Sequence, residues 1–208
     1  MSPEPAPLST VVFQEGGRGA RSIINQLISP RAIAWVSTRS SDGIDNLAPH
    51  SYVTVASTDP LVVSFTSIGV KDTLRNVLAT GEFVVGGVPR ALKHQANISG
   101  APFGPEVSEF DAAGVTRAPS QMVSPCGVKE SPFAIECRLR EVHVVGNGSM
   151  VLGDVLCISV SDTVIEDGRV SSRAMDLVSR GGGDDWYALG EVWRMARPSV
   201  GDSGAHSH

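Results

Sequence analysis

The sequence predicts a mainly β protein, an antiparallel barrel with a few inserted helices. Two observations predict this fold class. Segments rich in β-branched and aromatic residues recur along the chain, and Asp-Gly or Asn-Gly pairs, which favour tight hairpin turns, stand at residues 42–43, 147–148 and 167–168. Such short connections join antiparallel strands, because a parallel pair needs a long crossover. A doubly wound parallel sheet is therefore disfavoured.

The first half of the chain is predicted to begin with three strands. They cover residues 32–40, 46–57 and 61–67. Pro49 interrupts the second of these strands and indicates a sheet edge or a bulge, because proline has no N–H to donate to a β-ladder.

The next segment changes to a helical period. Over residues 73–81, Leu74, Val77 and Leu78 share a helical face, and Gly81 is a common helix stop. After a strand over 82–88, two further helices are predicted over 89–100 and 108–114, the first of which opens with a proline.

The second half is predicted to return to strands, over 131–146 and 150–165, with a short strand after the 167–168 turn. Residues 21–198 are expected to form one domain. Residues 1–20 are expected to be a flexible lead-in, and residues 199–208 a flexible tail.

The bulk composition excludes several classes of protein. The 208 residues are 41% hydrophobic and have a formal net charge of −5, which suits a globular domain and not a partner of nucleic acid. No run of 18 apolar residues predicts a membrane span, and the N-terminus does not resemble a secretory signal. The three cysteines form no CxxC pair, which predicts a cytoplasmic protein with reduced thiols.

Residues 67–76, SIGVKDTLRN, allow two interpretations. Asp72 or Thr73 could simply cap the helix that follows. Alternatively, Lys71, the nearby hydroxyls and the free N–H groups of the helix start could bind a phosphate. The segment lacks the GxxxxGK[ST] pattern of a nucleoside triphosphate site.

Other motifs are weaker. The segment SRGGGDDWY at 179–187 could let a ligand approach the backbone closely, or could be a flexible loop before a last helical piece. His50 could face a pocket. The histidines are otherwise scattered, so no metal centre is predicted, and no catalytic triad or carboxylate pair is found.

One family matches this order of segments. PRAIAWVSTRSSDGIDNLAPHSYVTVASTDPLVVSFTS followed by KDTLRNVLATGEFVV resembles the flavin reductase-like family with an FMN-binding split barrel. HQANIS, ESPFAIECRL, LGDVLCISV and SRGGGDDWY continue the resemblance, which covers roughly residues 22–190. The resemblance implies a split antiparallel barrel that forms a homodimer and binds FMN, or FAD, near the interface.

The resemblance also implies the site. Lys71 and Thr73 would hold the phosphate, the backbone of residues 48–50 would lie along the isoalloxazine ring, and Arg180 would border the cofactor or nicotinamide site. Asp72 would orient rather than touch the phosphate, since like charges repel. The family more often has an aromatic residue where His50 stands. The implied flavin-binding residues are Ser37, Thr38, Asn46, Leu47, Ala48, Pro49, His50, Ser51, Ser67, Lys71, Asp72, Thr73 and Arg180.

The expected function is transfer of hydride from NAD(P)H to FMN or FAD, and the expected partner for the reduced flavin is a monooxygenase. The flavin carries this chemistry, so no catalytic side chain is assigned. Two alternatives stay open: an FMN-binding electron carrier or flavoprotein with its own substrate, and a barrel that has lost its ligand.

Overall fold

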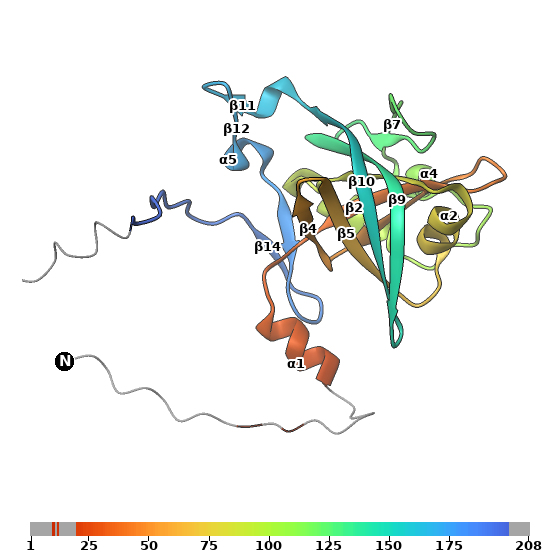
Figure 1. Ribbon diagram of the computed structural model, residues 1–208, viewed down its shortest axis with the longest axis horizontal. Helices are drawn as coiled ribbons and strands as arrows, with labels where there is room; N and C mark the ends of the chain where they lie inside the picture. Colours follow the sequence, from red (N-terminus) through yellow and green to blue (C-terminus); the bar gives the residue numbers. More distant parts are fainter. Residues whose placement is uncertain (1–9, 11, 13–19, 200–208) are drawn as a thin grey trace, which may run out of the picture.

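The structure is a computed structural model that describes residues 10, 12 and 20–199 (Figure 1). Apart from residues 10, 12, 20 and 199, the predicted lead-in and tail lie outside the described residues. Seven strands form the main sheet: β2 (Ala34–Arg39), β3 (Asp45–His50), β4 (Val53–Thr58), β5 (Leu61–Ile68), β6 (Glu82–Gly86), β9 (Phe133–Val145) and β10 (Gly148–Val160). Their order is β3-β2-β6-β9-β10-β5-β4, and every neighbouring pair is antiparallel, as predicted.

The predicted strand over residues 46–57 is in fact two strands. Its first part is β3, which pairs with β2, and its second part is β4, which pairs with β5. These two strands form the opposite edges of the curved sheet, so the chain crosses from one edge to the other between residues 50 and 53. Pro49 lies in β3, which is an edge strand of the sheet, so the prediction of a sheet edge at this proline is confirmed.

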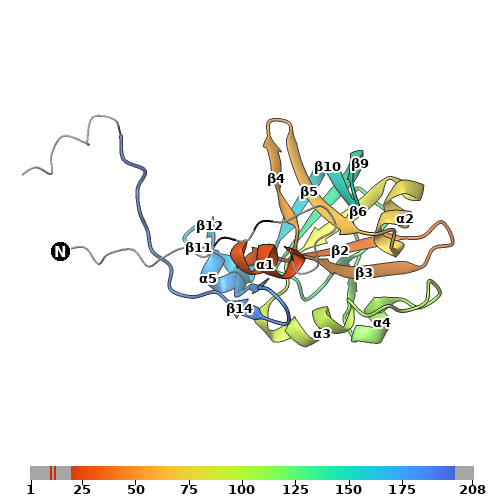
Figure 2. The ribbon, with the colours of Figure 1, turned by 90° about the horizontal axis from the view of Figure 1, so that it is seen from below.

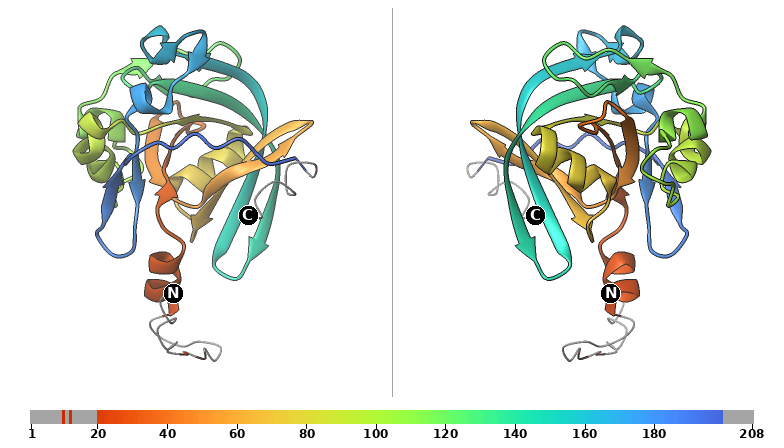
Figure 3. Two further views of the ribbon diagram at one scale, coloured as in Figure 1. Left: turned by 90° about the vertical axis from the view of Figure 1, so that its left-hand side faces the viewer. Right: turned by 90° about the vertical axis from the view of Figure 1, so that its right-hand side faces the viewer.

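Helix α2 (Asp72–Thr80) follows β5 and ends at Gly81, whose φ of 74° is left-handed, as the glycine stop predicted. In both views of Figure 3, α2 lies within the outline of the curved sheet. Leu74 and Val77 are buried in the barrel core with Phe65 and Phe83. Leu78 does not share their burial and is 58% exposed, because the helix face toward the sheet is narrower than the sequence pattern indicated.

A second layer covers the outer face of β2 and β3. The predicted helix over 89–100 is a 3-10 turn, η1 (Arg90–Leu92), followed by α3 (Lys93–Ile98), and α4 (Glu109–Ala113) comes next. Figure 2 shows α3 and α4 beside each other along the β2–β3 hairpin. Trp35, Leu47 and Phe110 form the core of this layer, and the Trp35 indole Nε1 donates to the Ser99 hydroxyl at 2.9 Å.

Two further segments pack together beside this layer, since Val178 belongs to the same hydrophobic cluster as Trp35 and Trp186 packs against it. Helix α1 (Ala20–Leu27) and strand β1 (Arg31–Ala32) precede the sheet, and β1 pairs with the hairpin of β13 (Val178–Arg180) and β14 (Trp186–Ala188). Helix α1 was not predicted. For residues 179–187, the alternative of a flexible loop before a helical piece is wrong, because they form a β-hairpin and no helix follows in the described residues up to 199.

The remaining elements are short connections. They are β7 (Arg117–Ala118), β8 (Gly127–Val128), η2 (Asp162–Val164), β11 (Ile165–Glu166), β12 (Arg169–Val170) and α5 (Ser172–Met175). The turn at Asp167–Gly168, with φ values of 50° and 72°, joins β11 to β12 as predicted. The β9–β10 turn lies one residue earlier than predicted, at Gly146–Asn147, because Gly146 supplies the positive φ and Gly148 already pairs with Val145. Among the described helices, none combines the length and the apolar character that a membrane crossing needs.

Candidate functional site

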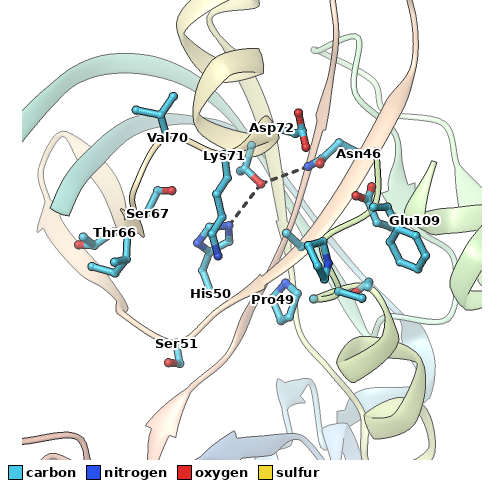
Figure 4. Close-up of a pocket in the computed structure, with 18 of the residues that line it drawn as sticks. Asn46, Pro49, His50, Ser51, Thr66, Ser67, Val70, Lys71, Asp72 and Glu109 are labelled. Carbon is cyan, nitrogen blue, oxygen red and sulfur yellow. Dashed lines mark hydrogen bonds between the residues drawn. The ribbon is translucent and has the colours of Figure 1, made fainter. Parts of the chain in front are cut away.

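A cavity of about 380 Å³ opens where β3, the end of β5, the start of α2 and the loop after α3 meet (Figure 4). We call it the α2 cavity. Its lining is mainly polar and comes from segments far apart in the sequence. The lining residues are Arg21, Asn46, Ala48, Pro49, His50, Ser51, Tyr52, Thr66, Ser67, Ile68, Val70, Lys71, Asp72, Thr73, Arg75, Ser99, Gly100, Ala101, Pro102, Phe103 and Glu109.

The start of α2 forms one wall of this cavity. Lys71 is the N-cap residue, and no side chain caps the helix. The prediction that Asp72 or Thr73 provides the cap is therefore wrong: Asp72 pairs with Arg75, and the Thr73 hydroxyl faces Asn46 and His50. Because the first N–H groups of a helix lack intrahelical acceptors, the wall presents donors and a partial positive charge beside the Lys71 ammonium.

A buried hydrogen-bond network fixes this wall against the sheet. The Asn46 side-chain amide donates to Thr38 Oγ1 at 3.2 Å and to Thr73 Oγ1 at 3.1 Å. Asn76, on α2, donates to the same Thr38 hydroxyl at 3.1 Å. The dashed lines in Figure 4 mark the bonds that join Asn46 and His50 to Thr73. The network therefore ties β2, β3 and the first turn of α2 together behind the cavity.

His50 is a neutral part of the wall. The pKa of His50 is lowered to about 4, mainly by burial; a hydrogen bond to the backbone of Thr66 opposes this shift, and the positive charge of Lys71 adds to it. The ring packs against Phe65 with 4.8 Å between centroids, and Nε2 lies 3.4 Å from Thr73 Oγ1. A neutral imidazole leaves Lys71 as the cationic side chain at this point of the wall.

Glu109 is a buried carboxyl on the same cavity. It is 6% exposed, and its Oε2 accepts the backbone N–H of Leu47 at 3.0 Å. Burial raises the pKa of Glu109, the Leu47 hydrogen bond lowers it, and the negative charge of Asp72 raises it. Figure 4 shows Asp72, Asn46 and Glu109 on one side of the view, away from Ser51 and Thr66. The carboxyls therefore concentrate at one side of the cavity.

A neighbouring cavity of about 360 Å³ shares a wall with the first. We call it the arginine cavity. Its lining residues are Arg21, Ile33, Pro49, Ser51, Lys71, Asn97, Gly100, Arg180 and Trp186. Arg180 donates to the Gly183 carbonyl at 2.7 Å, and its guanidinium carbon lies 5.1 Å from the centroid of the Trp186 ring.

The structure brings most of the implied flavin residues together. The α2 cavity is lined by nine of them: Asn46, Ala48, Pro49, His50, Ser51, Ser67, Lys71, Asp72 and Thr73. Arg180 lines only the arginine cavity. Ser37, Thr38 and Leu47 line neither cavity, because their side chains are buried inside the fold at 0–2% exposure. Thr38 acts on the cavity wall through Asn46, while the Ser37 hydroxyl donates to the Cys126 carbonyl. Flavin contact by any of these residues stays a prediction.

Sequence reasoning missed Glu109 and Arg21. Glu109 follows Ser108 at a helix start, where an acidic residue is common for the helix alone, so nothing marked it as a cavity residue. Arg21 lies on the missed helix α1. Only the apolar spacing of residues 23, 24, 27 and 28 could have indicated that helix.

Comparison with known proteins identifies the family of this chain. Residues 28–173 match the flavin reductase like domain family. The chain belongs to this family. Nitrilotriacetate monooxygenase component B from Bacillus cereus is 27% identical, covers 92% of this chain and 100% of its own, and has a TM-score of 0.84.

Two further solved structures are similar. The 2-nitrobenzoate 2-nitroreductase NbaA from Pseudomonas fluorescens is 26% identical, over 92% of this chain and 98% of that chain, with a TM-score of 0.81. A protein with a split barrel domain from Shewanella frigidimarina is 23% identical, over 91% and 100%, also with a TM-score of 0.81. The family member described here is thus mainly β, with the split-barrel fold that the sequence predicted.

Proposed function

We propose that the protein binds FMN in the α2 cavity and transfers hydride from NAD(P)H to it. The observation that carries this proposal is the uncapped start of α2, which places donors and the Lys71 ammonium on a cavity that Ala48, Pro49 and His50 also line. A phosphate ester fits such a wall, because an anion is stabilised by free N–H groups at a helix start. Membership of the flavin reductase-like family supports flavin as the ligand.

The residues at the start of α2 have different roles in the proposed phosphate binding. The neutral His50 ring donates through one nitrogen to the backbone of Thr66 and so accepts the Thr73 hydroxyl proton at Nε2. With Asn46 donating to the same hydroxyl, Thr73 offers the phosphate its backbone N–H rather than its side chain. Lys71 then supplies the charge. FAD remains an alternative to FMN at this site.

When bound, the flavin supplies the ring that accepts hydride, so the chain needs to bind, orient and exclude water. Ala48 and Pro49 provide a wall without a titratable side chain beside the ring position. The buried network behind Thr73 keeps this wall fixed. Arg180 and the glycines after it would border the nicotinamide, as the resemblance implies.

A second candidate is a flavoprotein that acts on its own substrate, or an FMN-binding electron carrier. The similarity to a nitroreductase favours a flavoprotein with its own substrate. The similarity to a monooxygenase component instead supports release of reduced flavin to a partner enzyme.

A homodimer and a cytoplasmic location are also proposed. The homodimer is supported by apolar residues of and next to α1 that a partner subunit could cover: Ile24 is 49% exposed, Leu27 is 75% exposed and Ile28 is 60% exposed.

Anaerobic absorbance spectroscopy would test the proposed activity. When NADH or NADPH is added to the purified protein with FMN, we expect the visible absorbance band of the flavin to bleach as the nucleotide is oxidised. Retained FMN that neither nucleotide reduces would select the second candidate. Failure to bind FMN, FAD or riboflavin would contradict both.

A further inference from the structure

The arginine cavity concentrates positive charge. Arg21, Lys71 and Arg180 line it, and its lining contains no carboxylate. The chain as a whole has a formal net charge of −5, so this grouping runs against the overall balance. Among the described residues, no ion pair joins Arg21 or Lys71 to a carboxylate, and Arg180 has only Asp184 at 3.9 Å, a fully exposed partner that contributes little. The cavity therefore suits an anion.

The lining of the same cavity also includes apolar side chains. Trp186, Ile33 and Pro49 line it beside the cations. The Arg180 guanidinium is held against the Trp186 ring and by the Gly183 carbonyl, so its orientation is set before any ligand binds. A planar ring can lie against these groups while its charged substituent reaches the guanidinium.

Arg31 assembles the walls of the cavity. Its guanidinium donates to the carbonyls of Asn25 and Ile28, at the end of α1, and to the Gly181 carbonyl in the β13–β14 hairpin at 2.6 Å. Its Nε donates to Ser51 at 3.4 Å. One side chain thus joins the helix that bears Arg21 to the hairpin that bears Arg180.

Close packing reinforces this junction. A Cβ on Gly182 would lie 2.5 Å from Cγ of the Gln26 side chain on α1, so a larger residue at this position would require that side chain to move. The Asn25 side chain also accepts the Tyr52 hydroxyl at 2.6 Å. The positions of Arg21 and Arg180 are therefore built into the fold.

We propose that the arginine cavity binds a small aromatic carboxylate beside the flavin. The guanidinium fork matches a carboxylate, and the apolar lining residues Trp186, Ile33 and Pro49 suit an aromatic ring. The volume of about 360 Å³ lies near the lower end for ligand cavities and suits a single-ring ligand better than a dinucleotide. The adjacency to flavin rests on the proposed function, since the two cavities share Arg21, Pro49, Ser51, Lys71 and Gly100.

Calorimetric titration of benzoate into the full-length protein, with and without FMN, tests this inference. We expect the Arg180→Gln variant to bind benzoate about tenfold or more weakly, the effect of losing a charge-assisted hydrogen bond. Arg140→Gln is the matched control, because Arg140 is also a partly exposed arginine in an ion pair, with Asp154, but lines neither cavity. Arg21→Gln, on a different element, keeps the test open if Arg180→Gln does not fold.

Two comparison ligands separate charge from shape. Benzamide lacks the negative charge and cyclohexanecarboxylate lacks the flat ring, so both should bind more weakly than benzoate, and added salt should weaken benzoate binding. Equal binding of benzoate and benzamide, or equal benzoate affinity in the wild type and Arg180→Gln, would overturn the proposal. So would a loss of nicotinamide mononucleotide binding in Arg180→Gln with benzoate binding unchanged.

The experiment distinguishes this inference from the proposed function. If FMN binds and is reduced but benzoate does not bind at millimolar concentration, the inference is wrong and the proposed function stands. If benzoate binds in an Arg180-dependent way to protein that never binds FMN, the cavity assignment stands and the flavin assignment fails.

Discussion

The Thr73 hydroxyl is the point where the helix start, the edge strand and the buried histidine meet. It accepts a hydrogen bond from Asn46 and faces His50 Nε2. A hydroxyl has one proton to donate, and the Thr73 hydroxyl donates it in a hydrogen bond to Nε2 of the neutral His50 ring. The side chain that looks most suited to a phosphate is therefore already committed to the fold, while the Thr73 N–H and Lys71 are not.

Replacement of His50 tests the charge state of this network. Between pH 6.5 and about 4 the unfolded chain binds a proton at His50 and the folded chain does not, so the free energy of unfolding falls as the pH falls. We expect the flavin-free wild type to lose on the order of 3 kcal/mol over this range from His50 alone. His50→Phe should remove that part of the pH dependence.

Chemical denaturation at a series of pH values measures the effect. His94→Gln is a suitable control, because His94 is an exposed histidine on α3 that lines neither cavity. An identical pH dependence in the wild type and His50→Phe would show that His50 titrates normally and that the network is not as described.

At the scale of elements, a glycine in β10 lets the barrel core close. The β9–β10 ladder shifts register between Leu152 and Gly153. A Cβ on Gly153 would lie 2.3 Å from Cζ of the fully buried Phe83 ring and 3.1 Å from Cβ of Cys137. The absence of a side chain at this position is thus what makes room for Phe83 between the strands.

We therefore expect Gly153→Ala to destabilise the protein by about 1–3 kcal/mol, the usual cost of overpacking a core. Urea denaturation should show a lower midpoint with an unchanged slope. Gly190→Ala is the matched control, since a Cβ there meets no atom within 4 Å. Equal midpoints for Gly153→Ala and the control would mean that Phe83 can move aside at no cost.

The helices, strands and turns that were predicted correctly are those that the local sequence pattern determines. The antiparallel sheet, α2 with its Gly81 stop and the Asp167–Gly168 turn all follow from local pattern and turn chemistry. The division of residues 46–57 into two strands did not follow, because alternation says nothing about which strand pairs with which. The short helix α1 was hidden because its apolar residues follow a Gly- and Pro-rich stretch and remain largely exposed.

The residues of the site also fall into those that the sequence could predict and those that it could not. Apart from Leu47, the implied residues from Asn46 to Ser51 and from Ser67 to Thr73 meet at the α2 cavity, because one set lies in and just after β3 and the other at the end of β5 and the start of α2. Glu109 and Arg21 could not be predicted, since each reaches the site through a tertiary contact: Glu109 through the Leu47 N–H, and Arg21 through the α1 junction at Arg31. Residue type alone does not encode such contacts.

At the scale of the whole molecule, the barrel supports two neighbouring cavities of different character. Carboxyls gather at one side of the α2 cavity, and cations line the arginine cavity. Lys71 belongs to both. The central claim is that Lys71 and the start of α2 hold the phosphate of a flavin, because this arrangement explains an uncapped helix at the mouth of a barrel.

Calorimetric titration of FMN and of riboflavin, which lacks the phosphate, tests this claim most directly. Lys71→Ala should weaken FMN binding by about 1.5–3 kcal/mol and leave riboflavin binding unchanged, because only FMN presents the anion. Lys93→Ala, on the exposed surface of α3, should change neither affinity. Equal weakening of FMN and riboflavin by Lys71→Ala, or no preference of the wild type for FMN, would contradict a phosphate site at the start of α2.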